Sequence, residues 1–187
     1  MKIVNFLYLG NLIPEKGVLV LLEACRILAK EHKTFRCHIV GAGTKALCVE
    51  ECRTLVENLN LVDVVEVHGP LYGDEKEKMW ERCDVFVFPT FYHNECFPLV
   101  ILEAMQHALL VIATPVGAIP DMVIDEKTGH LVPIQDVKAL SDTMLLIMNN
   151  TSLLRRMGER GHERYLDNYT TKHFEENLTD ILRSCYA

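Results

Sequence analysis

The sequence lacks long apolar stretches and clusters of basic residues. No apolar run reaches about 18 residues, the length at which a membrane-spanning helix becomes a candidate, and no secretory leader opens the chain. The formal net charge is −7, and no segment is rich in lysine and arginine, which argues against nucleic acid or an anionic membrane as the main partner. We therefore expect a soluble, cytoplasmic protein in which an anionic ligand would need a local site.

Metal-binding signatures are also scarce. The seven cysteines include no Cys-x2-Cys pair and no cluster of cysteine with histidine, so the sequence does not predict zinc, and we expect reduced structural thiols. Asp-x-Asp is absent as well, so a metal held by paired carboxylates is not supported. The sequence thus predicts no metal and no cofactor.

A regular alternation of short apolar runs with helical segments is present. The 187 residues, 49% of them hydrophobic, can bury the core of one domain over 1–187. The predicted strands are 4–10, 35–41, 64–68, 84–89 and 110–113. The predicted helices are 18–30, 44–59, 74–82, one from Pro98, 137–148, 153–166 and 171–185. This order predicts an α/β fold, a Rossmann-like parallel sheet with helices on both faces.

Two acidic residues stand out after the fourth predicted strand. Glu95 lies in a loop, and Glu103 lies in the helix that Pro98 can start. That helix is otherwise apolar nearly all round, so we expect it to be buried and Glu103 to need a partner. Helical side chains lean towards the N-terminus, so both carboxylates could border one crevice. The residues assigned to the helix start, whose free amides suit an anion, are Cys96, Phe97, Pro98, Leu99 and Val100.

Glycine-containing loops follow the first three predicted strands. A glycine turn that leads into a helix with a lysine on the way can hold a phosphate, although the P-loop pattern is absent. Ligands of parallel sheets bind at the carboxyl ends of the strands, where these loops lie. The candidate binding residues are Gly10, Asn11 and Lys16 in the first loop, Gly41 and Gly43 in the second, and Gly69 and Leu71 in the third. Together with the two acids, they suit a sugar attached to a nucleotide.

The stretch Glu-Cys-Phe-Pro-Leu-Val-Ile-Leu-Glu-Ala, which begins at Glu95 and contains Glu103, resembles the Glu-x7-Glu motif of retaining glycosyltransferase family 4, whose two-domain architecture is called GT-B. The resemblance implies that Glu95 contacts the donor sugar, that Glu103 binds the ribose hydroxyls and that Lys16 binds the diphosphate. Glu95 and Lys16 are thereby the catalytic candidates. Cys96 stands at the family's glycine position, and its side chain would leave a ligand less room to come close to the backbone there. Asn11 stands at its arginine position, which would weaken the diphosphate contact.

The resemblance runs from about Val4 to the end of the chain, but it covers only the donor-binding, C-terminal half of a GT-B enzyme. It implies binding of a nucleotide sugar and transfer of a hexose-type sugar to a glycan, lipid or other acceptor. The missing N-terminal half would bring the acceptor and could place the enzyme at the inner face of a membrane. We expect this chain alone to transfer the sugar poorly. We also expect helix 171–185 to leave apolar surface uncovered, which favours a homo-oligomer.

The segment 114–121, after the fifth predicted strand, resembles the family's Thr-x-x-Gly-Gly-x-Pro-Glu. We expect this segment to be mainly structural and Asp121 to cap a helix.

Other interpretations of the sequence stay open. Gly41-x-Gly43-x-x-Ala46, with Glu66 about 20 residues further on, fits a dinucleotide-binding fingerprint, although it follows the second strand. A glycosidase using both acids would need them about 5 to 9.5 Å apart. A noncatalytic binding or assembly domain would bind the donor without turnover.

Overall fold

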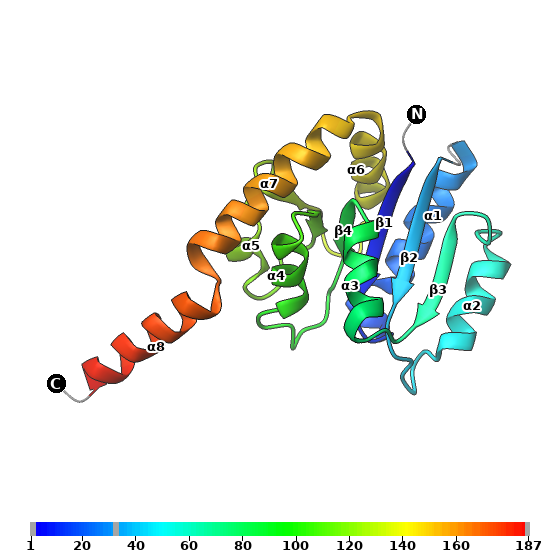
Figure 1. The fold of residues 1–187 in the computed structure, drawn as a ribbon. Helices are drawn as coiled ribbons and strands as arrows, with labels where there is room; N and C mark the ends of the chain where they lie inside the picture. The colour runs from blue at the N-terminus through cyan, green and yellow to red at the C-terminus, as the bar shows by residue number, and fades with distance from the viewer. Residues whose placement is uncertain (1–2, 32–33, 186–187) are drawn as a thin grey trace.

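A computed structural model describes residues 3–31 and 34–185 (Figure 1). Within these residues six parallel strands form one sheet in the order β3-β2-β1-β4-β5-β6. The strands are β1 Val4–Leu9, β2 Phe35–Val40, β3 Val65–Gly69, β4 Val85–Phe88, β5 Leu110–Ala113 and β6 Gly129–Leu131. The first five agree with the sequence prediction to within one residue at each end, whereas β6 was not predicted.

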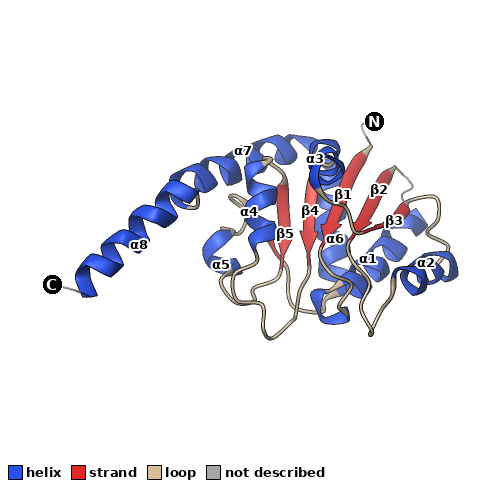
Figure 2. Cartoon of the chain, turned by 60° about the horizontal axis from the view of Figure 1, so that its bottom comes forward, coloured by secondary structure: helices blue, strands red, loops and turns tan. Residues whose placement is uncertain are grey.

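Helices cover both faces of the sheet, as predicted (Figure 2). On one face lie α1 Val18–Glu31, α2 Val49–Asn58 and α6 Val137–Asn149. On the other face lie α3 Gly73–Arg82, α4 Leu99–Gln106 and α7 Thr151–Asn168. Strands β4 and β5 are buried along their whole length, as a parallel sheet between two helical layers requires. The strand order reverses between β1 and β4, so the crevice at their carboxyl ends is where a ligand is expected.

Helix α2 begins at Val49, so the predicted start at residue 44 was wrong. The Thr44 hydroxyl donates to the carbonyl of Leu12 at 2.9 Å, which holds this segment in a loop. Cys48 then caps the helix: the Glu51 amide donates to its sulfur at 3.4 Å, and the Glu51 carboxylate accepts from the Cys48 amide at 2.7 Å. A reciprocal capping box of this kind fixes a helix start.

Helix α4 is only half covered, so the prediction that it is buried nearly all round was wrong. Pro98 is its N-cap rather than its first residue, and Leu99 is 66% exposed. The helix packs one face against α7. The buried residues of that face are Ile101, Ala104 and Met105. Away from that face Leu99 is open to solvent, and Val100 and Leu102 are only partly buried.

The short helix α5, Ile119–Met122, follows β5. Ala118 is its N-cap, without a side-chain capping bond, and Asp121 lies inside the helix. The prediction that Asp121 caps a helix was therefore wrong. Pro120 in the first turn explains the early start, because proline is already set for the helical backbone angle.

Helix α8, Thr171–Cys185, projects away from the rest of the chain (Figure 1). None of its residues is buried, which confirms the predicted uncovered apolar surface. Its exposed apolar side chains are Phe174, Leu178, Ile181 and Leu182. Association through this surface stays a prediction. Among the helices of residues 3–31 and 34–185, none has both the length and the apolarity that crossing a membrane would require.

All seven cysteines are free thiols, as predicted, but they divide into two groups. Cys25, Cys37, Cys52 and Cys83 are buried, and Cys48, Cys96 and Cys185 are exposed. Burial raises the pKa of Cys52 to about 11 and that of Cys83 to about 12. Only a thiolate is strongly nucleophilic, so the buried thiols should be unreactive in the folded protein.

Alkylation of the native protein with iodoacetamide at about pH 8 should therefore modify three cysteines first. Mass spectrometry of peptides should find the label on Cys48, Cys96 and Cys185, and on the remaining four only after denaturation. Labelling of Cys52 or Cys83 as fast as that of Cys185 in the native protein would contradict their burial.

Candidate functional site

The three glycine loops that follow β1, β2 and β3 are joined by main-chain hydrogen bonds. The Gly10 amide donates to the carbonyl of Val40 at 3.0 Å, and the Gly41 amide donates to the carbonyl of Gly69 at 2.9 Å. The Leu12 amide donates to the carbonyl of Ala42 at 2.8 Å. These bonds bring the predicted residues Gly10, Gly41 and Gly69 to one edge of the sheet.

Gly41 is the position at which this edge has no room for a side chain. A Cβ atom on Gly41 would lie 1.8 Å from the carbonyl oxygen of Gly10, whereas a Cβ on Gly10 would make ordinary contacts from 3.6 Å. Gly43 packs against the start of α2, since its Cβ would lie 2.9 Å from the Val49 amide nitrogen. We predicted that these glycines let a ligand come close to the backbone. In the structure, they let neighbouring segments of the backbone pack closely against one another.

A cleft of about 170 Å³ opens beside these loops. Its lining contains the predicted residues Gly10, Asn11, Gly41 and Leu71, together with Leu9, Val40, Ala42, Pro70, Tyr72 and Lys76. The buried Tyr8 hydroxyl lies below and donates to the carbonyl of Asn11 at 3.2 Å. Burial raises the pKa of Tyr8, so this phenol keeps the proton with which it holds the loop.

Lys16 and Glu95 form an ion pair beside the cleft-forming loops. Lys16 ends the short 3-10 helix η1, Pro14–Lys16, and its Nζ lies 3.3 Å from Oε2 of Glu95. Their side chains are 21% and 10% exposed. Oε2 of Glu95 makes no hydrogen bond within the described part of the chain. A buried carboxylate oxygen without a hydrogen-bond partner can accept a hydrogen bond from a hydroxyl group of a ligand.

The loop that carries Glu95 is fixed to the segment that carries Lys16. The Phe91 amide donates to the carbonyl of Glu15 at 2.7 Å, and the Thr90 hydroxyl donates to the same carbonyl at 3.4 Å. Gly17, with φ of +87°, lies so close to Pro89 that a Cβ would be 2.1 Å from its carbonyl oxygen. The Lys16–Glu95 pair is thus set by backbone packing.

The segment after β5 supports the Glu95 loop from the other side. The Thr114 hydroxyl donates to the carbonyl of Thr90, and the Ala118 amide donates to the carbonyl of Cys96 at 2.8 Å. A Cβ on Gly117 would lie 2.0 Å from the Glu95 carbonyl oxygen. This segment, which we predicted to be mainly structural, packs directly against the site loop.

Glu103 is paired with a residue that sequence reasoning missed. Nζ of Lys76, in the first turns of α3, lies 2.8 Å from Oε1 and 2.7 Å from Oε2 of Glu103. Lys76 also lines the cleft, so it connects Glu103 with the loops after β1, β2 and β3. Helix α3 is rich in charged residues, and nothing in its sequence distinguishes Lys76 from neighbouring Lys78.

The predicted residues at the start of α4 do not all face the cleft. Phe97 and Leu99 line a separate groove of about 480 Å³ between α4 and α8, and the Phe97 ring lies 6.2 Å from the ring of Tyr169. Cys96 is exposed, and Val100 is half-buried. The side chains of Phe97 and Leu99 therefore belong to this groove, and only their amides remain available for an anion beside Glu95.

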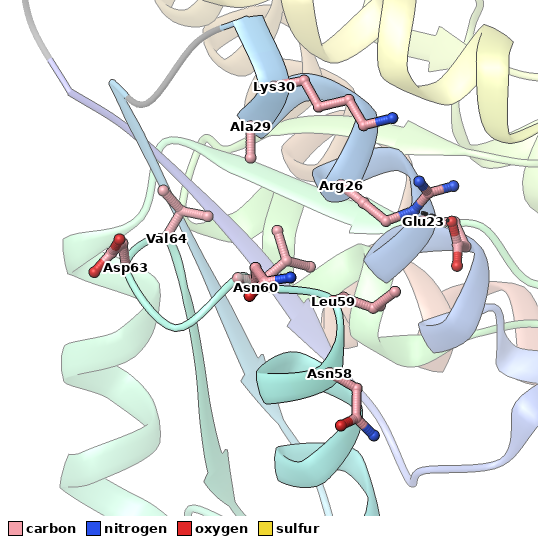
Figure 3. A pocket seen from close by; sticks show the side chains of 10 residues that line it. Glu23, Arg26, Ala29, Lys30, Asn58, Leu59, Asn60, Asp63 and Val64 are labelled. Atoms are coloured by element: carbon pink, nitrogen blue, oxygen red, sulfur yellow. Dashed lines mark hydrogen bonds and ion pairs between the residues drawn. The ribbon is translucent and has the colours of Figure 1, made fainter.

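A roomier hollow of about 580 Å³ lies elsewhere (Figure 3). The C-terminal half of α1 and the segment 58–64 before β3 line it, and it contains the Glu23–Arg26 ion pair at 2.6 Å. None of the predicted site residues lines this hollow. It lies where β3 begins rather than where the strands end, so it is not the expected ligand crevice.

The dinucleotide-binding alternative lacks the required geometry. Gly41 and Gly43 are followed by a loop, and α2 begins only at Val49. Glu66 lies within β3, next to His38 and His68, rather than at a strand end. The fingerprint requires the glycine turn to open a helix and the acid to reach a ribose.

The sequence profile described as Glycosyl transferases group 1 matches residues 4–164. WcaL of Escherichia coli (strain K12), assigned provisionally as a colanic acid biosynthesis glycosyltransferase, is 30% identical over 180 residues. The alignment covers 94% of this chain and 44% of WcaL. The chain therefore spans less than half the length of this relative.

Two solved structures resemble the fold. The C-terminal domain of LpcC, a glycosyl transferase group 1 family protein from Francisella tularensis, aligns with a TM-score of 0.79 and 23% identity, covering 90% of this chain and 87% of that domain. Anabaena HepE in complex with UDP-glucose aligns with a TM-score of 0.85 and 19% identity, covering 97% of this chain and 49% of HepE. At these identities the likeness establishes the fold alone.

Proposed function

The chain belongs to the glycosyl transferases group 1 family, and we propose that it is the nucleotide-sugar-binding domain of a retaining enzyme that transfers a hexose-type sugar. Its Rossmann-like α/β fold is that of the C-terminal half of GT-B glycosyltransferases. One observation carries the proposal: each predicted acid is paired with a lysine, Glu95 with Lys16 and Glu103 with Lys76, at the carboxyl ends of the strands.

This arrangement matches the chemistry of a nucleotide-diphosphate sugar, which carries phosphates and hydroxyls on one molecule. Lysine binds phosphate as a point charge, and a carboxylate in an ion pair still has lone pairs that accept hydrogen bonds from hydroxyl groups. In our proposal Glu103 binds the ribose hydroxyls and Glu95 binds the donor sugar. The loop of Gly69 and Leu71 packs on the base. HepE, which shares the fold, was crystallised with UDP-glucose.

Transfer places negative charge on the leaving diphosphate, and Lys16 is the residue proposed to stabilise it. A fixed positive charge aimed at developing negative charge stabilises the transition state, because it needs no reorganisation during the reaction. The amides at the start of α4 would act on the same group. We propose no metal for this step.

The acceptor would be held by the N-terminal half of a GT-B enzyme. This chain spans 44% of the length of WcaL, and the described residues form a single sheet with its covering helices. We therefore propose that the chain alone binds the donor but does not transfer it efficiently. The acceptor, a glycan or lipid in our proposal, enters with the other half.

Glu103→Gln is expected to weaken donor binding by about 10- to 100-fold, because a charged hydrogen-bond acceptor typically contributes about 1.5 to 3 kcal/mol. Isothermal titration calorimetry with UDP-, GDP- and ADP-sugars measures this loss on the sugar that binds best. Glu77→Gln is the matched control: Oε2 of Glu77, on α3, lies 3.2 Å from Nε2 of His107, the C-cap residue of α4. Unchanged binding by the Glu103→Gln variant would contradict the assigned role.

Thermal-shift and turnover measurements distinguish the remaining alternatives. A glycosidase would show a thermal shift with oligosaccharides and none with nucleoside diphosphates, since it needs no phosphate site. A noncatalytic binding domain would bind the donor but give no turnover when the N-terminal half is supplied. Binding of a nucleotide sugar by this chain, with turnover restored by the N-terminal half, is the expected result.

A further inference from the structure

Two histidines and one glutamate gather on the edge of the sheet, away from the acid–lysine pairs. His38 lies on β2, and Glu66 and His68 lie on the edge strand β3. The strand register pairs His38 with Glu66. Glu66 and His68 are two positions apart, so they project from the same face of β3. The sheet itself therefore places three potential metal ligands together.

The donor atoms of this cluster have the spacing of a metal site. Nδ1 of His38 lies 3.1 Å from Nε2 of His68, and Oε2 of Glu66 lies 3.6 Å from each of these nitrogens. Ligands of tetrahedral Zn²⁺ at their usual bond lengths are about 3.3 to 3.5 Å apart. The three atoms thus form one face of a tetrahedron of nearly the right size.

We propose that His38, Glu66 and His68 bind Zn²⁺ through Nδ1, Oε2 and Nε2, with a fourth position open to water. Two imidazoles and one carboxylate form a donor set that Zn²⁺ favours. The sequence predicted no metal, because it contains no close pair of cysteines and histidines, and only the strand register brings these ligands together. None of the three ligands is among the proposed donor-binding residues, although His68 directly precedes Gly69.

The His38 ring makes its polar contacts within this cluster. His38 is fully buried, and its other nitrogen, Nε2, has no hydrogen-bond partner within the described residues. Glu66, in contrast, has a side chain that is 61% exposed, and that of His68 is 15% exposed. The buried ring forms the base of the site, and an ion can reach the donor atoms from the solvent side of β3.

The bound ion would join two strands where their pairing is irregular. The register between β2 and β3 shifts between Ile39 and Val40, immediately after His38. A ligand that binds only the folded protein stabilises it. We therefore expect Zn²⁺ to raise the melting temperature.

Cobalt titration of the reduced, chelator-treated protein tests the proposal. The wild-type chain should bind one equivalent of Co²⁺, displaceable by Zn²⁺, with intense visible bands and no thiolate-to-cobalt charge transfer. Glu66→Gln and His68→Gln should each weaken binding by at least about tenfold, the loss that even an outer-shell partner can cause. Both side chains reach solvent, so these variants avoid the buried His38.

Glu77→Gln again provides a matched control. Its carboxylate is 59% exposed, nearly as Glu66 is, and it contacts one histidine rather than two. This variant should bind cobalt as the wild type does. Loss of binding in Glu77→Gln, equal binding in Glu66→Gln and wild type, a thiolate charge-transfer band, or no binding at micromolar cobalt would each overturn the proposal.

Discussion

Replacing Gly41 by alanine is expected to destabilise the chain by about 3 kcal/mol or more, the range of substitutions that force atoms into occupied space. The added Cβ would lie 1.8 Å from the Gly10 carbonyl oxygen and 2.8 Å from its carbonyl carbon. Both contacts are with backbone, so no side-chain rotation can relieve them. The loops after β1 and β2 would have to separate, and the bond from the Leu12 amide to Ala42 would be lost.

Gly10→Ala is the matched control, because it adds the same methyl group on the other side of this contact. The atoms nearest to its Cβ would belong to the Tyr8 and Phe88 side chains, at 3.6 Å and beyond, so the free energy of unfolding should change little. Urea denaturation followed by circular dichroism measures both variants. Equal stability of the two variants would show that the loops are not held as close as described.

Lys16→Met is expected to impair both folding and donor binding. It leaves the Glu95 carboxylate, whose side chain is 10% exposed, without its ion-pair partner, at a cost of about 1 to 3 kcal/mol. Donor affinity should fall by about 10- to 100-fold, because a charged contact to phosphate is lost. Urea denaturation and calorimetric titration with the best nucleotide sugar measure the two effects.

A second substitution separates these effects. In the Lys16→Met, Glu95→Gln double variant the buried group is neutral, so most of the lost stability should return. Donor binding should stay weak, because the positive charge of Lys16 and the Glu95 carboxylate proposed to bind the sugar are both absent. Recovery of binding in the double variant would contradict the donor contacts proposed for both residues.

The strands could be predicted from the sequence because each is a short apolar run bounded by turn residues. The parallel direction of the strands followed from their alternation with helices, whereas the order of the strands in the sheet was not predicted. In contrast, β6 was missed because its three residues, of which His130 is polar, carry no apolar run. The start of α2 was missed because a threonine bond to Leu12 and a cysteine cap depend on contacts between distant segments.

The acids of the candidate site could be predicted, but only one of their partners could. Lys16 lies in a glycine loop that the sequence singles out. Lys76 lies on a charged helix and reaches Glu103 only because α3 and α4 cover the same face of the sheet. The half-exposed face of α4 was not predicted either, because residue composition alone does not show that this face lines an open groove with α8.

The hydrogen bonds that tie Glu15, Thr90 and Thr114 together have a consequence for protein engineering. Segments 10–17, 89–98 and 114–118 are interlocked through Gly17 and Gly117, each of which meets a carbonyl of the 89–98 segment. A chimera that imports one of these segments from a relative would mismatch the other two. To change the proposed sugar specificity, all three segments should therefore be exchanged together for those of one relative.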